Sequence, residues 1–244
     1  MAMELEANIS RFIGEIEAAA GSAISSITLY GSAATGDHVP GRSDLNFLLV
    51  AERVDLALLD RLQSMMATWA KRGIAAPLIV DRDFLERSTD SYPLEILGMV
   101  ASKRVLRGAD PLEGLHPKAS DVRVQVEREA KSKELLLRRG YLESRGKDRA
   151  LRSYLAATAP ALEAILRGIL FVEGGDWNKN GADLIRAGEG RLRLDLSALR
   201  EIREIRAARR KPDRTAAIAL YGKALDLFAV LADRADREND GEDA

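Results

Sequence analysis

Residues 29–50 read L-Y-G-S-A-A-T-G-D-H-V-P-G-R-S-D-L-N-F-L-L-V. Two apolar segments, 26–30 and 45–50, stand on either side of a loop that is rich in Gly, Ser and Asp. The second segment holds almost no polar residue, which is typical of a strand that is covered on both faces. The stretch therefore predicts two β-strands joined by a polar loop, in a sheet flanked by helices.

Strands and helices alternate along the rest of the first half. The expected elements, in chain order, are helices over 4–20 and 54–72, a strand over 74–80, a short helix from Asp83, a helix after Pro93 and a strand over 104–106. Pro77 favours a sheet edge for the strand that contains it, and Asp83 begins a sequence with the form of a capping box. The pattern predicts an α/β (α+β) domain with a mixed sheet.

The second half has no strand signal. Helical patterns cover 122–144, 151–172, 182–186, 196–208 and 215–236, with breaks at 174–175, 188–190 and 211–212. Glycine and proline at these breaks indicate connections between helices. We expect a domain over 1–117, an all-helical bundle domain over 118–237 and a disordered acidic tail over 238–244.

The composition narrows the class of protein. The hydrophobic share of 46% and the charged share of 31% are those of a soluble globular chain. The chain has no cysteine, which excludes disulfides and thiolate metal sites and fits a reducing cytoplasm. The most apolar helical stretch is interrupted by Pro160, Glu163 and Arg167, so we expect no membrane partner.

The loop after the first strand contains the residues that could bind a phosphate and a metal ion. Side chains at i and i+2 of a strand share one face, so Asp44 and Asn46 point to the same side. Gly31 would let the backbone approach a phosphate, and Ser32 adds a hydroxyl and a turn with free N–H groups. Carboxylates that hold Mg²⁺ beside such a turn are a common way to neutralise a nucleoside triphosphate.

Gly31-Ser32, the eleven-residue spacing and Asp44-Leu45-Asn46 resemble the signature of the DNA polymerase β-like nucleotidyltransferase superfamily. The resemblance covers residues 25–113, and Y-P-L-E-I-L and V-L-R-G-A-D-P-L within it look like segments of uncharacterised bacterial members. It implies a nucleotidyltransferase-like sheet and an appended helical domain that helps to hold the substrate.

The same resemblance implies a set of site residues. The catalytic positions would be Asp44, Asn46 and Asp81, the last standing for an acid expected on a neighbouring strand. Asp44 and Asp81 would hold Mg²⁺ or Mn²⁺, and the nucleotide would lie at Gly31, Ser32 and Ser43. The partners would be a nucleoside triphosphate and an acceptor, either a small molecule or a protein.

Three positions depart from the family's pattern. Asn46 stands where the family has a second acid, and an amide offers one carbonyl oxygen and no charge. Because Mg²⁺ prefers charged oxygen ligands, its affinity should fall. Thr35 stands where a basic residue is often found, and Asp81 at a strand end can equally be a turn residue.

Two functions follow from these residues. The first is transfer of a nucleoside monophosphate from the triphosphate to a hydroxyl, weakened by Asn46. The alternative is a catalytically inactive regulatory protein that binds a nucleotide or a partner on the same fold. A helical interaction module on an inert first half is a third interpretation.

Other polar residues have competing explanations. Arginines at 200, 203, 206 and 210 lie on one helical face that could bind phosphates or RNA, but nearby glutamates and the lack of aromatic residues favour a solvated face. A nucleic-acid partner is therefore left open. His38 and His116 are expected on the surface, and Tyr154 and Trp177 either in a cleft or in the core. No histidine follows residue 117, which argues against a helical ribonuclease domain.

Overall fold

The computed structural model describes residues 2–39, 41 and 43–237. Its contacts divide the chain into two compact units: residues 1–89 with 102–116, and residues 90–101 with 117–244. The first is called the sheet unit and the second the helical unit. Residues 90–101, which the sequence grouped with the first domain, therefore pack with the helical unit. The tail over 238–244, expected to be disordered, lies outside the described residues.

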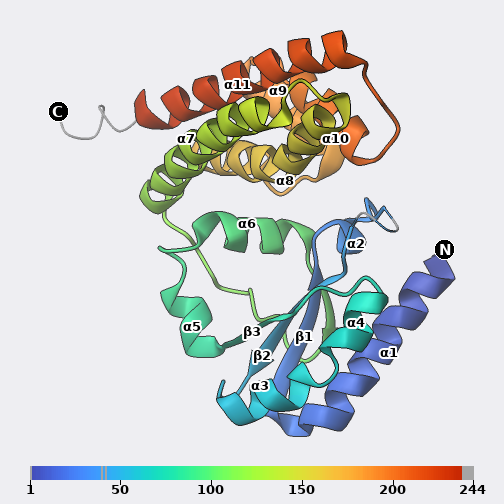
Figure 1. Ribbon diagram of the computed structural model, residues 1–244. Helices are drawn as coiled ribbons and strands as arrows, with labels where there is room; N and C mark the ends of the chain where they lie inside the picture. The colour runs from blue at the N-terminus through green and yellow to red at the C-terminus, as the bar shows by residue number, and fades with distance from the viewer. Residues whose placement is uncertain (1, 40, 42, 238–244) are drawn as a thin grey trace. The chain divides into compact units, whose positions relative to one another are not determined.

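The sheet unit is built on a four-stranded mixed sheet with the order β3-β2-β1-β4. Its strands are β1 (Ile24–Tyr30), β2 (Asn46–Ala51), β3 (Leu78–Asp81) and β4 (Arg104–Arg107). β1 is antiparallel to β2 and to β4, whereas β2 and β3 are parallel. Figure 1 shows β1 and β2 side by side, with their connection at one end of the sheet. This connection is the loop that the sequence singled out.

Helices cover one face of this sheet. They are α1 (Ala2–Ala20), α3 (Leu56–Gln63) and α4 (Met66–Lys71), while the short helices α2 (Ser32–Thr35) and α5 (Arg82–Arg87) follow β1 and β3. Phe12 of α1 stacks on Phe47 of β2 with ring centroids 4.0 Å apart, and Trp69 of α4 packs against the same ring of Phe12 at 4.9 Å. Phe47 to Ala51 are all buried, as expected for a strand covered on both faces.

The helix predicted over 54–72 is two helices in the structure. α3 ends at Gln63 and α4 begins at Met66. The hydroxyl of Ser64 donates to the carbonyl oxygen of Arg61, 2.8 Å away, and such a bond competes with the helical hydrogen bonds of the backbone. The apolar spacing continues through the break, which is why it was not visible in the sequence.

The helical unit contains most of α6 and five further helices. Their bounds are α6 (Pro93–Ser102), α7 (Ala119–Ser144), α8 (Asp148–Val172), α9 (Gly181–Leu192), α10 (Ser197–Arg206) and α11 (Arg214–Arg237). α8 lies at the centre, and its apolar residues form one core with those of the other five. By length and composition alone, α8 and most of α11 could cross a membrane. Both helices contribute buried residues to the core of this unit.

The break predicted at 188–190 is wrong, because both glycines lie inside α9. Gly188 faces α8, where a side chain would lie 2.8 Å from methyl groups of Leu166 and Leu196. The missing side chain therefore allows close helix packing rather than a turn. Glycine alone does not distinguish these two uses in a sequence.

Candidate functional site

The ends of β1 and β2 bring the sequence motif together. Tyr30 pairs with Asn46 in the antiparallel register, so Gly31 follows directly beside Asn46. A Cβ atom on Gly31 would lie 3.4 Å from the Nδ2 atom of Asn46. Gly31 itself has φ 79° and ψ −157°, a region that is essentially restricted to glycine. The chain therefore turns sharply beside the Asn46 amide, as the sequence predicted.

Gly31 is held by a residue that the sequence did not indicate. Its N–H donates to the Oγ atom of Ser102, 2.9 Å away, and Ser102 is buried. Its carbonyl oxygen accepts from the N–H groups of Ala34 and Thr35 at 3.0 and 3.3 Å. The N–H and carbonyl groups of Gly31 thus both form hydrogen bonds within the sheet unit. A ligand could therefore approach Gly31 only at its Cα atom, which carries no side chain.

Ser32 and Ser43 differ in how they are used. The hydroxyl of Ser32, half-buried at the start of α2, makes no hydrogen bond to any residue that the structure describes. In contrast, Ser43 closes the loop before β2: its N–H donates to the carbonyl oxygen of Val39 at 2.8 Å, and its Oγ accepts from the Val39 N–H at 3.3 Å. Ser32 can therefore turn to a ligand, whereas Ser43 has a structural role.

Asp44 precedes β2 and is exposed. Its carboxylate makes neither a hydrogen bond nor an ion pair within the described part of the chain. The side chain of Asn46 donates from Nδ2 to the backbone carbonyl oxygen of Asp44 over 3.5 Å, a long contact. The two residues form an acid and an amide side by side, next to Gly31.

Asp81 does not lie beside Asp44 and Asn46. It lies opposite Ala51 in the parallel pair of β2 and β3, five residues beyond Asn46. At roughly 3.3 Å per residue, this register separates Asp81 from the level of Asn46 by about 17 Å along the strands. Its carboxylate accepts the N–H of Phe84 at 2.7 Å and caps α5. Asp83, which the sequence assigned as the cap, lies within the first turn of α5.

Apolar residues occupy the positions of β3 that face the same way as Asn46. Asn46 and Leu48 lie on the same face of β2, because they are two residues apart. Leu48 pairs with Leu78, so Leu78 is the residue of β3 on this face that lies nearest to Asn46. Within the described residues, no group of three His, Asp or Glu side chains could hold a metal ion. The site has one carboxylate, Asp44, where a two-metal centre needs several.

A buried hydroxyl lies below the site on the same face of the sheet. Thr28 pairs with Leu48, is fully buried, and its Oγ1 atom has no hydrogen-bond partner among the described residues. The neighbouring Tyr30 is half-buried, and this burial raises the pKa of its hydroxyl. The alternation of Ser26, Thr28 and Tyr30 with Ile27 and Leu29 was the available sequence signal.

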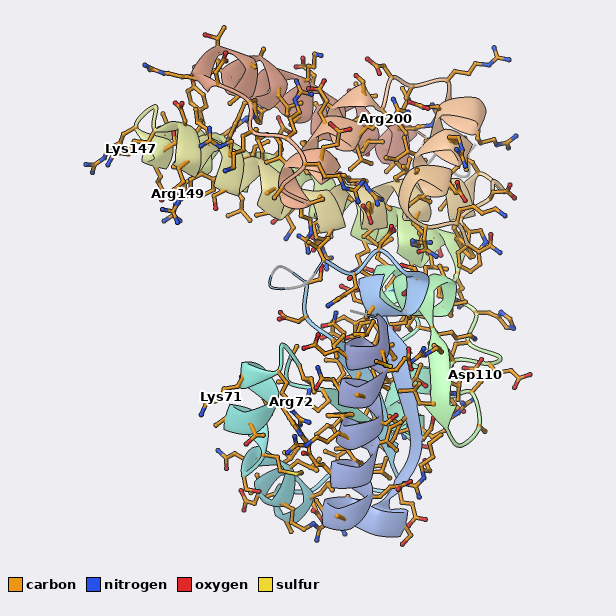
Figure 2. The ribbon with its side chains drawn as sticks, turned by 90° about the vertical axis from the view of Figure 1, so that its right-hand side faces the viewer. Lys71, Arg72, Asp110, Lys147, Arg149 and Arg200 are labelled. Carbon is orange, nitrogen blue, oxygen red and sulfur yellow. The ribbon has the colours of Figure 1, made fainter. Side chains whose placement is uncertain are left out.

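The arginine face of α10 is largely neutralised. One guanidinium nitrogen of Arg200 donates to both carboxylate oxygens of Glu189 at 2.8 and 2.9 Å, Arg203 pairs with Glu163 at 2.8 Å, and Arg210 pairs with Glu201. Figure 2 labels Arg200 on the helical unit. These pairs support the interpretation as a solvated face. His116 is exposed and His38 half-buried, while Tyr154 and Trp177 pack against the helical core.

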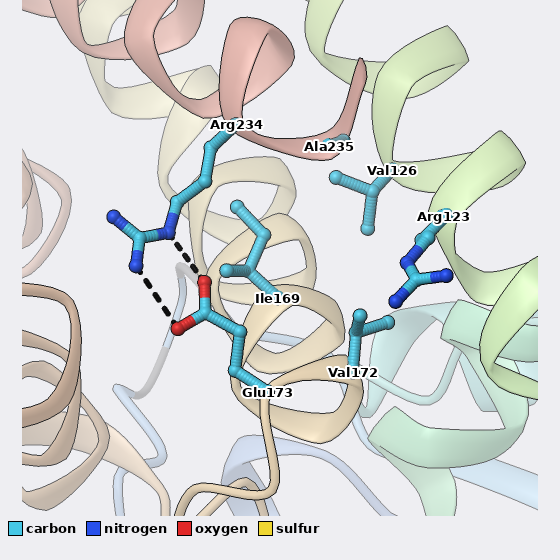
Figure 3. Close-up of a pocket in the computed structure, with 7 residues that line it drawn as sticks. All are labelled: Arg123, Val126, Ile169, Val172, Glu173, Arg234 and Ala235. Atoms are coloured by element: carbon cyan, nitrogen blue, oxygen red, sulfur yellow. Dashed lines mark hydrogen bonds and ion pairs between the residues drawn. The ribbon is translucent and has the colours of Figure 1, made fainter. Parts of the chain in front are cut away.

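A small pocket lies within the helical unit. Figure 3 shows its apolar floor of Val126, Ile169 and Val172, with the ion pair between Arg234 and Glu173 on one side. Its volume of about 10 Å³ can hold at most about one water molecule. It is therefore too small for a nucleotide.

No protein-family model and no curated protein matches this sequence. The structure is similar to the crystal structure of spectinomycin adenyltransferase AAD(9) from Enterococcus faecialis, which contains ATP and spectinomycin. The TM-score is 0.56 at 13% sequence identity, and the match covers 95% of this chain and 99% of that one. At this identity the similarity concerns the fold. The expected nucleotidyltransferase-like sheet with a helical C-terminal region is confirmed.

Proposed function

We propose that this protein binds a nucleoside triphosphate at the turn after β1, with its phosphates beside Gly31 and Ser32 and a divalent cation, Mg²⁺ or Mn²⁺, on Asp44. The observation that carries the proposal is the register of β1 and β2, which places Gly31 beside Asn46 and Asp44 in a nucleotidyltransferase-like fold. The similar adenyltransferase was crystallised with ATP, which supports a nucleotide as the ligand.

The residues fit one cation better than two. Mg²⁺ is commonly held by one or two carboxylates together with substrate phosphates, and Asp44 with the amide oxygen of Asn46 can supply the protein's share. When bound, the cation neutralises part of the triphosphate charge. A second cation would need another carboxylate, and Asp81 is committed to α5 at the far end of β3.

Transfer of a nucleoside monophosphate would be slow at such a site. The oxygen of an acceptor hydroxyl would bond to the α-phosphorus, the bond from that phosphorus to the β-bridging oxygen would break, and pyrophosphate would leave. The hydroxyl proton needs a base, and the nearest position on β3, Leu78, is apolar. The acceptor, a small molecule or a protein, would therefore be modified at a strongly reduced rate.

The same observation supports a second candidate function, a regulatory protein that binds a nucleotide or a partner without turnover. The absence of cysteine is consistent with action in a reducing cytoplasm for either function. The two candidates share the nucleotide site and differ only in catalysis, so binding and transfer are tested separately.

Binding is tested by thermal unfolding with ATP, GTP, CTP or UTP, each with Mg²⁺ or Mn²⁺. A ligand at about 100 times its Kd stabilises the folded protein by about 2.7 kcal/mol. We expect this gain for the unaltered protein and for Asp60→Asn, which removes an exposed carboxylate from α3. Asp44→Asn should lose most of it. No gain with any of the four triphosphates would refute the nucleotide site.

Transfer is tested with triphosphates labelled at the α-phosphate, using spectinomycin and protein acceptors. The unaltered protein should label acceptors slowly or not at all. Asn46→Asp restores one acid, and Asn46→Asp with Leu78→Glu restores two on one face of the sheet, so the double variant should be the fastest. Measurable and equal rates for the unaltered protein and the double variant would contradict the proposal that Asn46 weakens transfer. If the unaltered protein, the single variant and the double variant all fail to label an acceptor, the catalytically inactive regulatory protein is favoured.

A further inference from the structure

Unpaired positive charge gathers at one end of the helical unit. The connection between α7 and α8, taken with the first residues of α8, carries Arg145, Lys147 and Arg149. The connection between α10 and α11, taken with the first residue of α11, carries Arg209, Lys211 and Arg214. All six are exposed, and none forms an ion pair with a described residue. These six residues are called the basic end.

Two contacts join the connections, although about 60 residues separate them in the chain. Arg152, in the first turns of α8, donates to the carbonyl oxygen of Pro212 at 2.9 Å. A Cβ atom on Gly146 would lie 2.7 Å from a guanidinium nitrogen of Arg214. Figure 1 shows both connections at the same end of the helical unit, and Figure 2 shows Lys147 and Arg149 projecting from it.

The positive charge at this end is poorly compensated. The two connections, taken with the helix residues named above as 145–149 and 209–214, contain seven cations and two acids, a net charge of +5. The acids are Asp148, in the first turn of α8, and Asp213, which accepts the Ala216 N–H at 2.9 Å. The seventh cation, Arg210, is already paired with Glu201. The six exposed cations of the basic end thus have only two carboxylates, Asp148 and Asp213, within the same segments to balance their charge.

The arrangement carries an electrostatic cost that a bound anion would remove. Lys147 occupies the N-cap position of α8, a 25-residue helix, and makes no capping hydrogen bond with its side chain. A cation beside a helix N-terminus opposes the helix dipole, and like charges in neighbouring loops repel one another. Elsewhere in the helical unit, several cations of the long helices, among them Lys131, Arg138 and Arg139, are paired with acids one turn away.

We propose that the basic end binds the phosphate backbone of a nucleic acid. Four of its six cations are arginines, whose planar guanidinium groups bond phosphate oxygens in pairs. Aromatic residues for base stacking are missing from the two connections, so the contacts are with phosphates and independent of base sequence. This surface belongs to the helical unit alone and does not depend on the nucleotide site.

The proposal is tested by fluorescence anisotropy with a labelled duplex of about 20 base pairs, in salt from about 50 to 200 mM. Six phosphate contacts predict a loss of affinity of about a thousandfold over this range. The variant with Lys147→Gln, Arg149→Gln and Lys211→Gln removes half of the contacts. We expect it to bind at least about tenfold more weakly at the lowest salt, with the salt dependence reduced by about half.

The matched control replaces Arg128, Lys179 and Arg193 by glutamine. These are also exposed cations of the helical unit without ion pairs to described residues, so the change in net charge is the same. Its affinity should stay within about twofold of the unaltered protein. Equal weakening in both variants would show that only net charge matters and would overturn the proposal.

Two further results would also overturn it. One is the absence of duplex and single-stranded RNA binding at the lowest salt. The other is binding to phosphatidylserine vesicles without binding to either nucleic acid, which would assign the surface to a membrane. Circular dichroism keeps the test interpretable, because the basic-end variant should unfold at the same or a higher temperature than the unaltered protein once the repulsion is relieved.

Discussion

The carboxylate of Asp81 accepts a hydrogen bond from the backbone N–H of Phe84, 2.7 Å away, at the first turn of α5. This bond satisfies one of the N–H groups that a helix leaves without a partner at its start. Asp81 therefore stabilises the end of β3 and the start of α5. It lies opposite Ala51, at the other end of β2 from Asn46.

We expect Asp81→Ala to lower the free energy of unfolding by about 0.5 to 2 kcal/mol, the usual cost of losing a helix cap. Asp83→Ala, which removes only an exposed ion pair with Arg87, should cost less than about 0.5 kcal/mol. Urea unfolding measures both. Nucleotide binding should be unchanged by either substitution, and a selective loss of cation-dependent binding in Asp81→Ala would show that Asp81 is a ligand after all.

Gly31→Ala should destabilise the protein through the backbone. Its φ of 79° and ψ of −157° are unfavourable for any residue with a side chain, at a cost of about 1 to 3 kcal/mol. Space is not the cause, because the added carbon would make an ordinary contact with Asn46. Gly36 has φ 83° and ψ 3° with open space around it, so Gly36→Asn should cost less. Equal costs in chemical unfolding would contradict this.

The sheet unit should lose stability in acid through Glu15. Burial opposes the ionisation of Glu15, but hydrogen bonds from Trp69 and Arg72 and the charge of Arg72 outweigh burial and lower its pKa from 4.5. A carboxylate with a lowered pKa stabilises the fold above the pKa of the unfolded chain and stops doing so as the pH falls through the folded value. The loss should thus begin as the pH falls below the ordinary pKa of 4.5 and should continue as the pH passes the lowered pKa of the folded state.

Glu15→Gln is the variant that isolates this effect. At neutral pH it should cost about 1 to 3 kcal/mol, because hydrogen bonds to a charged group are lost. The difference from the unaltered protein should shrink as the pH falls below about 5. Glu86→Gln, which removes an exposed i,i+4 pair with Arg82, should change little at either pH. A difference for Glu15→Gln that does not depend on pH would refute the linkage.

Arg167 should anchor the connection between α8 and α9. It is 5% exposed and donates to the carbonyl oxygens of Trp177 and Lys179 at 2.6 and 2.9 Å and to Oδ1 of Asn180 at 3.0 Å. Arg167→Met would leave these acceptors unsatisfied, at a cost of about 2 to 4 kcal/mol. Arg200→Met, which removes an exposed pair, is the control. Hydrogen exchange should speed up over residues 173–181 in the first variant only.

The local features of this protein follow from short stretches of its sequence. The spacing of apolar residues along α1, the all-buried β2 and the sharp turn at Gly31 depend on the periods of helix and strand and on which backbone angles a residue tolerates. The same local geometry made Asp44 and Asn46 neighbours. For that reason the position of the turn could be predicted from residues 29–50, whereas the nucleotidyltransferase-like fold was predicted from the family resemblance of residues 25–113.

The contacts that those features make depend on the tertiary structure. The register of β2 and β3 separates Asp81 from Asn46, Ser102 holds Gly31 across 71 residues, and two distant connections form the basic end. Such pairings depend on how buried side chains of several elements pack together, which no single segment encodes. A carboxylate at a strand end therefore looked like a metal ligand in the sequence and caps a helix in the folded chain.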